Sequence, residues 1–394
     1  MRILALMSGT SHDAIDAAAA DLARDGDTLR LTPLGTVSAA YSPGLRADLI
    51  SALPPAPTTM EQVCRLDTRI GQEFAALAVR ADRELCDGRA DLVVSHGQTV
   101  YHWTDDGRAL GTLQLGRSAW IAEATGHPVL SDLRPRDIAA GGQGAPLVSL
   151  FDVLWLRGRP GRPAAVNLGG IANITVPAPD GPPLAYDTGP ANALLDAATH
   201  HFTHGALPYD TNGALAARGT VHRPLLHHLL ADPYYARPAP KTTGKEHFHL
   251  PYLLSALAAL PTRTHPSPED ILATLAHLTA RTVADAAHSA AVTEVIASGG
   301  GTHNPTLLSA LRTALAPVPL LTSDTLGLPT TAKEPYAFTV LAWLTLHSLP
   351  STLPSCTGAR HPSLLGTLTP GREGWRLPER VGKGPERVEF EGGP

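Results

Sequence analysis

Two glycine-containing turns between apolar runs constrain the fold of this chain more than any other feature. Residues 3–22 hold two apolar runs separated by a polar, glycine-containing segment at 8–13, and the pattern returns at 164–176 around Gly169 and Gly170. Short apolar runs bounded by turn residues are typical of β-hairpins. The sequence therefore predicts an α/β protein in two halves, each opening on a glycine hairpin, which suggests a duplicated architecture.

Hydrophobic periodicity predicts most of the remaining elements. Short continuous apolar runs predict buried strands, and apolar residues every three or four positions predict helices. Strands are expected at 91–95, 113–115, 129–131, 184–186 and 294–297. Helices are expected at 61–86, 117–125, 192–204, 212–231, 268–290, 306–316 and 335–349.

Composition excludes several classes of protein. The 394 residues are 43% hydrophobic, enough for two or three domains, and the net charge of −5 offers no basic surface for nucleic acid or an anionic membrane. Three scattered cysteines argue against a disulfide framework. The first apolar run is too short for a signal peptide, and no apolar stretch is long enough to span a membrane. We expect a cytoplasmic enzyme or ATPase, and a homodimer stays open.

The glycine turns favour a nucleotide site. Glycine lets backbone N–H groups approach an anion closely, and a third such turn follows a strand at 299–301. Common phosphate motifs are absent: a P-loop around Gly244-Lys245 fails at Ala239 and Glu246, and a Rossmann fingerprint fails at Asn304.

A set of motifs along the chain resembles the anhydro-N-acetylmuramic acid kinase family. The resemblance covers about residues 1–370, and it is the order of the whole set that makes it specific. The motifs are 7–16 (MSGTSHDAID), 95–99 (SHGQT), 131–137 (SDLRPRD), 139–147 (AAGGQGAPL), 166–175 (VNLGGIANIT), 187–190 (DTGP), 241–246 (KTTGKE), 299–305 (GGGTHNP) and 353–359 (LPSCTGA). Ala14 and Ala191 stand where the family usually has glycine, and Pro335 interrupts the start of a helix near Glu334.

The resemblance implies a two-domain fold shared with sugar kinases, actin and chaperone ATPases, built from duplicated ribonuclease-H-like domains. We expect one domain at 1–127 plus about 348–370 and a second at 128–347. Residues 371–394 combine many charges with almost no apolar run, which predicts a disordered tail.

The resemblance also implies ATP and Mg²⁺ as cofactors. ATP phosphates and adenosine would contact three loops, whose residues are Gly9, Thr10, Ser11, His12, Asp13, Ala14, Ile15, Asp16, Gly169, Gly170, Gly299, Gly300, Gly301 and Asn304. Asp13 and Asp16 would hold Mg²⁺ through water, although turn capping accounts for both residues equally well. The histidines at 200, 201 and 204 are explained by chance in a chain with 18 histidines.

Asp187 is the candidate catalytic residue. It follows a predicted strand and precedes a predicted helix, so local sequence allows either a general base or a helix N-cap. The resemblance favours the base. It implies that water attacks C1 of 1,6-anhydro-N-acetylmuramic acid while the freed O6 takes the γ-phosphoryl of ATP. The product would be N-acetylmuramate 6-phosphate, an intermediate of cell-wall recycling.

Four residues at strand ends are candidate sugar ligands. His96 and Gln98 can bond sugar hydroxyls, and Arg134, with Asp137 nearby, can bind the lactyl carboxylate. The structural alternatives are loop hydrogen bonding for His96 and an ion pair between Arg134 and Asp137. Two other functions stay open: an ATP-gated regulator of the same fold, and a kinase for an ordinary hexose.

Overall fold

The computed structural model describes residues 1–9, 12–54, 56–105, 107–178, 181–261, 265–375 and 377–391. They form two compact units: the first comprises Met1–Arg157 and Ala332–Pro394, and the second comprises Gly158–Thr331. The first unit is larger than the sequence analysis expected, because 128–157 and 332–347 also belong to it. A buried ion pair between Lys333 and Asp152 joins these two added segments.

The first unit is built on a mixed sheet in the order β12-β6-β4-β1-β2-β3-β13, with β5 paired to β4. β1 is antiparallel to β2 and parallel to β4, and β4 is parallel to β6. Its strands are β1 (Arg2–Ser8), β2 (Ala14–Asp25), β3 (Thr28–Ala40), β4 (Leu92–Asp105), β5 (Arg108–Leu115), β6 (Val129–Ser131), β12 (Thr367–Thr369) and β13 (Arg387–Phe390). β1 is buried on both faces because helices cover both sides of the sheet.

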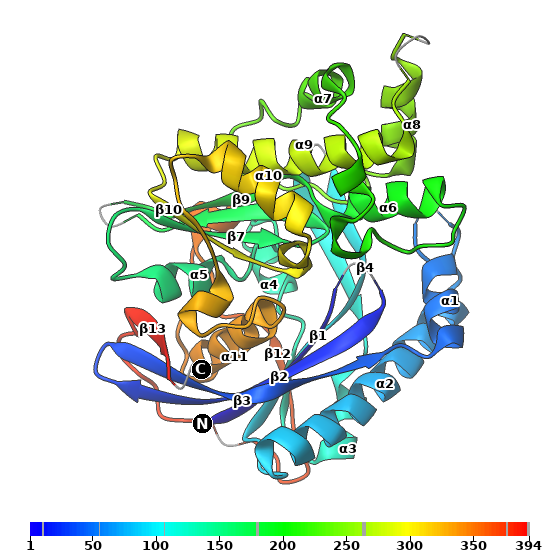
Figure 1. Cartoon of the computed structure of the whole chain (residues 1–394). Helices are drawn as coiled ribbons and strands as arrows, with labels where there is room; N and C mark the ends of the chain where they lie inside the picture. Colours follow the sequence, from blue (N-terminus) through cyan, green and yellow to red (C-terminus); the bar gives the residue numbers. More distant parts are fainter. Residues whose placement is uncertain are drawn as a thin grey trace. The chain divides into compact units, whose positions relative to one another are not determined.

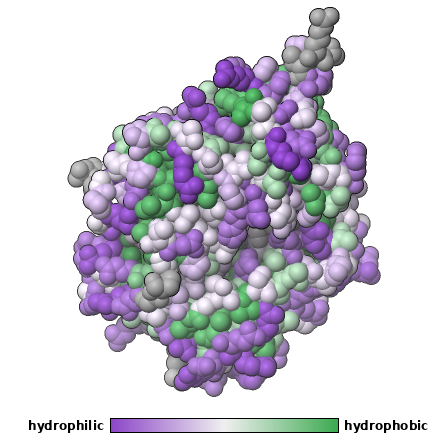
Figure 2. All heavy atoms as spheres, viewed as in Figure 1, coloured by the Kyte–Doolittle hydropathy of each residue, from purple (hydrophilic) through white to green (hydrophobic). Residues whose placement is uncertain are grey.

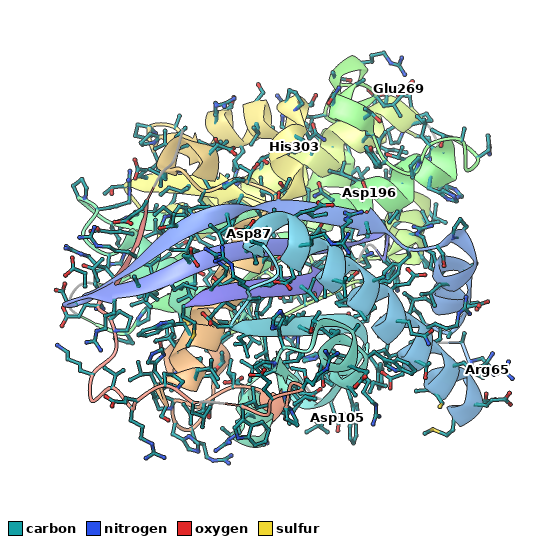
Figure 3. The ribbon with its side chains drawn as sticks, turned by 90° about the horizontal axis from the view of Figure 1, so that it is seen from below. Arg65, Asp87, Asp105, Asp196, Glu269 and His303 are labelled. Atoms are coloured by element: carbon teal, nitrogen blue, oxygen red, sulfur yellow. The ribbon has the colours of Figure 1, made fainter. Side chains whose placement is uncertain are left out.

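Two long helices cover the faces of this sheet. The helices of the unit are α1 (Pro43–Ser51), α2 (Met60–Cys86), α3 (Ser118–Thr125), α4 (Pro135–Ala139), α5 (Ser149–Leu156), α11 (Lys333–Leu346) and α12 (Pro354–Thr357). A capping box between Thr59 and Gln62 starts α2, and its apolar side packs on one face while α11 packs on the other (Figure 1). In Figure 3, α2 runs from near Arg65 to its C-cap Asp87.

Residues 387–390, near the end of the chain, form a strand, so the predicted disordered tail is wrong for this part. β13 pairs in parallel with β3, Val388 is buried, and the ring of Phe390 packs against Phe151 and Trp155. The four residues of β13 alternate between exposed and more buried side chains. This pattern is too short to predict a strand within a charged segment.

The second unit repeats the strand arrangement of the first. Its sheet has the order β11-β10-β7-β8-β9, in which β7 is antiparallel to β8 and parallel to β10. The strands are β7 (Pro163–Leu168), β8 (Ile171–Val176), β9 (Leu184–Pro190), β10 (Glu294–Ser298) and β11 (Leu320–Thr322). The match of β7-β8-β9-β10-β11 to β1-β2-β3-β4-β6, in order and direction, confirms the duplicated α/β architecture.

Helices α9 and α10 pack on the sheet of the second unit through alanine, valine and leucine. Its α-helices are α6 (Asn192–Phe202), α7 (Arg223–Leu230), α8 (Leu250–Ala258), α9 (Pro268–Ser289) and α10 (Pro305–Leu315), and its 3₁₀ turns are Thr211–Gly213, Ala216–Arg218, Gly300–His303 and Ser323–Leu326. The predicted helix at 212–231 is wrong before residue 223. Gly213 has a left-handed φ of +63°, and the Asp210 carboxylate accepts the N–H groups of Leu215 and Ala216, so a continuous helix cannot form there.

Hydrophilic side chains dominate the face shown in Figure 2, and smaller hydrophobic patches interrupt them. Within the described ranges, no helix combines the length and the apolar character that crossing a bilayer requires.

Candidate active site

The turn between β1 and β2 is held in place by Gln98 of β4. Ser8 Oγ lies 2.7 Å from the carbonyl oxygen of Ala14 and 2.8 Å from Gln98 Oε1, and Gln98 Nε2 donates to the Gly9 carbonyl at 3.2 Å. The hydroxyl of Tyr41 also donates to Gln98 Oε1. Gln98 is fully buried. Its side chain therefore shapes the first glycine turn, which differs from the predicted contact with sugar hydroxyls.

Asp13 and Asp16, the predicted magnesium residues, flank the start of β2. Asp13 is exposed and accepts the N–H of Ala14 at 2.9 Å, as expected for turn capping. Burial raises the pKa of Asp16, and the negative charge of Asp13 adds to this effect. The two carboxylates thus interact across the turn. Two of the predicted nucleotide residues, Thr10 and Ser11, lie outside the described residues.

His96 lies between an aromatic ring and a guanidinium group. Its ring stacks on Phe338 with a centroid distance of 4.8 Å, and its Nε2 accepts from Arg134 Nη2 at 3.0 Å and from Nε at 3.2 Å. Burial, together with the positive charge of Arg134, lowers the pKa of His96 well below its usual value. The neutral ring therefore carries its proton on Nδ1, a buried atom with no partner among the described residues.

The carboxylate of Asp137 forms hydrogen bonds within the first unit. It is fully buried, its Oδ1 accepts from the hydroxyl of Thr357 at 2.8 Å, and its Oδ2 accepts from the N–H of Gly144 at 2.8 Å. A Cβ on Gly142 would collide with the same carboxylate. Arg134 donates to the Gly144 carbonyl at 2.6 Å. Asp137 thus fixes the glycine loop at 141–144, which differs from the predicted contact with the sugar.

A charged cluster that was not predicted lies at the start of α11. Lys333 Nζ lies 2.9 Å from Asp152 Oδ1, and both side chains are at most 2% exposed. Burial raises the pKa of Glu334, while the charges of Lys333 and Arg134 act in the opposite direction. The charges of both Lys333 and Arg134 therefore act on the carboxyl of Glu334. The signal in the sequence was a Lys-Glu pair in front of a long apolar helix.

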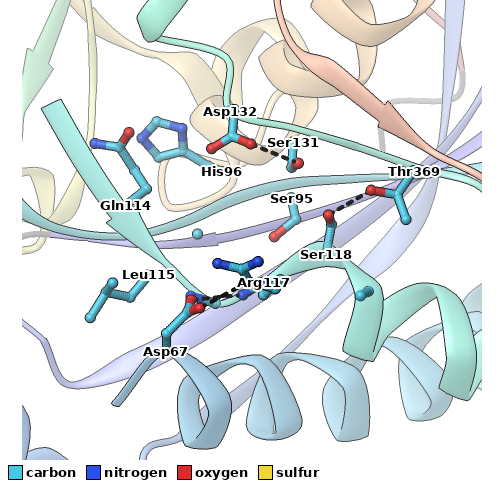
Figure 4. Close-up of a pocket in the computed structure, with 13 residues that line it drawn as sticks. Asp67, Ser95, His96, Gln114, Leu115, Arg117, Ser118, Ser131, Asp132 and Thr369 are labelled. Atoms are coloured by element: carbon cyan, nitrogen blue, oxygen red, sulfur yellow. Dashed lines mark hydrogen bonds and ion pairs between the residues drawn. The ribbon is translucent and has the colours of Figure 1, made fainter. Parts of the chain in front are cut away.

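A cavity of about 380 Å³ lies beside residues 95–97 of β4 and the end of β5 (Figure 4). An ion pair between Asp67 and Arg117 and a hydrogen bond of 2.7 Å between Ser118 and Thr369 lie at its edges. Among the described residues that line it, His96 is the one predicted sugar ligand.

The second glycine turn, between β7 and β8, is held by the start of α6. The N–H of Asn192 donates to the Gly169 carbonyl, and the N–H groups of Ala191 and Ala193 donate to the Gly170 carbonyl, each at 3.0 Å. The methyl group of Ala191 is buried in the core beside this turn.

The third glycine loop packs against the end of β7. Gly299 has a left-handed φ of +87°, and a Cβ there would lie 2.5 Å from Asn167 Oδ1. A Cβ on Gly301 would lie 2.7 Å from the side chain of Leu168. Asn304 caps α10 by accepting the N–H of Leu307 at 3.0 Å. The loop therefore approaches the second turn closely and depends on glycine at both positions.

Asp187, near the end of β9, does not cap α6. The N-cap of that helix is Ala191, and no side chain caps it. Asp187 is partly exposed, and its Oδ2 accepts the N–H of Thr243 at 2.9 Å. Its backbone N–H donates to the Lys241 carbonyl at 3.1 Å, and its carbonyl accepts from the hydroxyl of Tyr234 at 2.6 Å. Two neighbouring segments thus hold the backbone of Asp187, and the Thr243 N–H orients its carboxylate.

Two α/β units with one strand order, each opening on a glycine hairpin, define a protein of the sugar-kinase and actin-like ATPase class. More particularly, the chain belongs to the anhydro-N-acetylmuramic acid kinase family, whose model matches residues 1–371.

Curated relatives carry the same family name. The chain is 65% identical to the anhydro-N-acetylmuramic acid kinase of Streptomyces avermitilis over 99% of this chain and all of that one. It is 60% identical to the protein of that name from Streptomyces coelicolor over the full length of both. Among solved structures, it is similar to a ROK family glucokinase from Streptomyces griseus in complex with glucose and AMPPNP. That match has 13% identity and a TM-score of 0.37 and covers 86% of this chain and 99% of the glucokinase.

Proposed function

We propose that this chain is an ATP-dependent kinase that hydrolytically opens 1,6-anhydro-N-acetylmuramic acid. The products are N-acetylmuramate 6-phosphate and ADP, and the reaction serves cell-wall recycling. Membership of the family and the names of relatives at 60–65% identity support the substrate. The observation that carries the mechanism is the Asp187 carboxylate, which is partly exposed and oriented by the N–H of Thr243.

In this mechanism Asp187 accepts a proton from water as the water oxygen bonds to C1 of the sugar. The C1–O6 bond breaks, and O6 takes the γ-phosphoryl group while ADP leaves. A positioned carboxylate suits this role because it accepts a proton in the transition state. The hydrogen bond from Thr243 holds one carboxylate oxygen and so limits rotation of the side chain.

In the first unit, His96 and Arg134 bind the sugar. The proton on Nδ1 of His96 is a donor for a sugar oxygen, and the Arg134 guanidinium is suited to the lactyl carboxylate. Glu334 joins this group, since burial raises the pKa of its carboxyl and the charge of Arg134 acts on it.

The first turn fits ATP with Mg²⁺. Mg²⁺ prefers one or two carboxylates together with phosphate oxygens and water, and Asp13 and Asp16 supply two interacting carboxylates at a glycine turn. Within the described ranges no cluster of three or more metal-ligating side chains exists. When bound, Mg²⁺ neutralises phosphate charge. The glycine loop at 299–301 would contact the adenosine.

The test is the product formed from the anhydro sugar, ATP and Mg²⁺ in water enriched in oxygen-18. We expect a sugar monophosphate that carries the label at C1 and none in the phosphate, and no turnover after chelation of Mg²⁺. Label in the phosphate would mean that water attacks ATP, and sugar-independent ADP release would favour an ATP-gated regulator.

A further inference from the structure

Of the motif at 241–246, the reaction described so far uses only the N–H of Thr243, yet more of the segment lies against Asp187. The backbone of Asp187 donates to the Lys241 carbonyl, and its carboxylate accepts from the Thr243 N–H, so this segment contacts both the main chain and the side chain of the base. The motif turns back immediately afterwards, because the N–H groups of His247 and Phe248 both donate to the Gly244 carbonyl.

The ammonium group of Lys241 ties this segment to the turn at 232–235. Its Nζ donates to the carbonyls of Tyr234 and Tyr235 at 3.1 and 3.0 Å. It also lies 4.6 Å from the ring centroid of Tyr234 and 5.6 Å from that of Tyr186. A cation in this arrangement gains both hydrogen bonds and attraction to the aromatic faces.

Tyr234 connects the ammonium group of Lys241 to the backbone of Asp187. Its ring is 4% exposed, and its hydroxyl donates to the Asp187 carbonyl at 2.6 Å. Lys241 therefore reaches Asp187 by two routes: along its own chain to Thr243, and across Tyr234 to the backbone of Asp187. Loss of the ammonium group loosens both routes at once.

We propose that Lys241 is a positioning residue for the Asp187 base, acting through Tyr234 and Thr243 without touching the substrate. The inference rests on the proposed function, since it needs Asp187 to be the base. A displacement of about 1 Å in a reacting group can lower a rate about 100-fold. The loss of rate expected when Lys241 no longer positions Asp187 is therefore large enough to measure.

The experiment is a double-mutant cycle on the full-length protein with Lys241→Met and Asp187→Asn. Methionine keeps much of the length of lysine and removes the charge. We expect Lys241→Met to lower kcat at least about tenfold, with the KM values for sugar and ATP changed less than about twofold. In the Asp187→Asn background, measured by single turnover with labelled ATP, the same change is expected to have little further effect. Lys383→Met, which removes an exposed lysine of the first unit, is the matched control and is expected to behave like the wild type.

The pH profile gives a readout that a purely structural role would not move. The Thr243 N–H favours the charged form of the carboxylate, so weakening that bond raises the pKa of the base. The acidic limb of the kcat profile of Lys241→Met is therefore expected to move to higher pH. If Lys241→Met fails to fold, Tyr234→Phe replaces it in the cycle, because it removes only the hydroxyl bonded to the Asp187 carbonyl.

The outcomes separate this proposal from the proposed function. A kcat within twofold of the wild type, or an equal loss in both backgrounds, would overturn the positioning role and leave the function standing. Wild-type turnover in Asp187→Asn alone would overturn the base itself.

Discussion

Replacement of Asp187 by asparagine removes the proton-accepting group and leaves the surrounding bonds in place. The two contacts of its backbone, with Lys241 and Tyr234, do not depend on the side chain. The amide oxygen of asparagine can accept the N–H of Thr243 as the carboxylate does now. We therefore expect the free energy of unfolding to change by less than about 1 kcal/mol.

The expected loss of turnover is much larger than the change in stability. General base catalysis contributes about 10²–10⁴-fold, which at about 1.36 kcal/mol per tenfold change amounts to roughly 2.7–5.4 kcal/mol of activation free energy. Since Asp187 acts on water and not on the sugar or ATP, both KM values are expected to stay within about threefold of the wild type.

The assay couples ADP release to a spectroscopic signal at saturating ATP, Mg²⁺ and anhydro sugar, with urea unfolding in parallel. A kcat within tenfold of the wild type in a normally stable Asp187→Asn protein would refute the reasoning. A loss of stability by more than about 2 kcal/mol would show instead that the charge of Asp187 holds the second unit together.

Three further changes test other parts of the structure. Lys333→Met leaves Asp152 buried without its partner, so urea unfolding is expected to show a loss of about 3–5 kcal/mol, and a loss below about 1 kcal/mol would mean that the pair contributes little. Phe390→Ala removes a half-buried ring from the core of the first unit. It is expected to cost roughly 1–2 kcal/mol in the same assay with kcat unchanged, whereas no loss would mean that β13 is not docked in solution. Arg134→Ala is expected to raise the sugar KM more than it lowers kcat. An anhydro sugar without the lactyl carboxylate should not show this effect, and an equal effect on both sugars would contradict the role of Arg134.

Local patterns in the sequence were sufficient for the elements that carry their own signals. Both glycine hairpins were predicted at the right positions, because two apolar runs and the turn between them lie within about twenty residues. The helix predicted at 61–86 matches α2 within one residue at its start, since a capping box and an apolar stripe mark it. The duplicated fold followed from these elements.

Features that depend on distant partners were not predictable in the same way. β13 is ordered because it pairs with β3, from which it is separated by most of the chain. Gln98 and Asp137 have the residue types of sugar ligands, and only their buried partners show that they hold loops. The contacts of Asp187 with the segment at 241–243 could not be read from either motif alone, because nothing in the local sequence places the two together.

The two glycine turns have the same place in their sheets but are fixed by different means. In the first unit a side chain from the neighbouring parallel strand, Gln98, bonds Ser8 and the Gly9 carbonyl. In the second unit the first N–H groups of α6 bond the carbonyls of Gly169 and Gly170. The N-terminus of a helix is often an anion site, but here its donors are already used by the turn. These N–H groups are therefore not open to a phosphate, and we expect any phosphate contact of the second turn to come from the N–H groups of the glycines themselves.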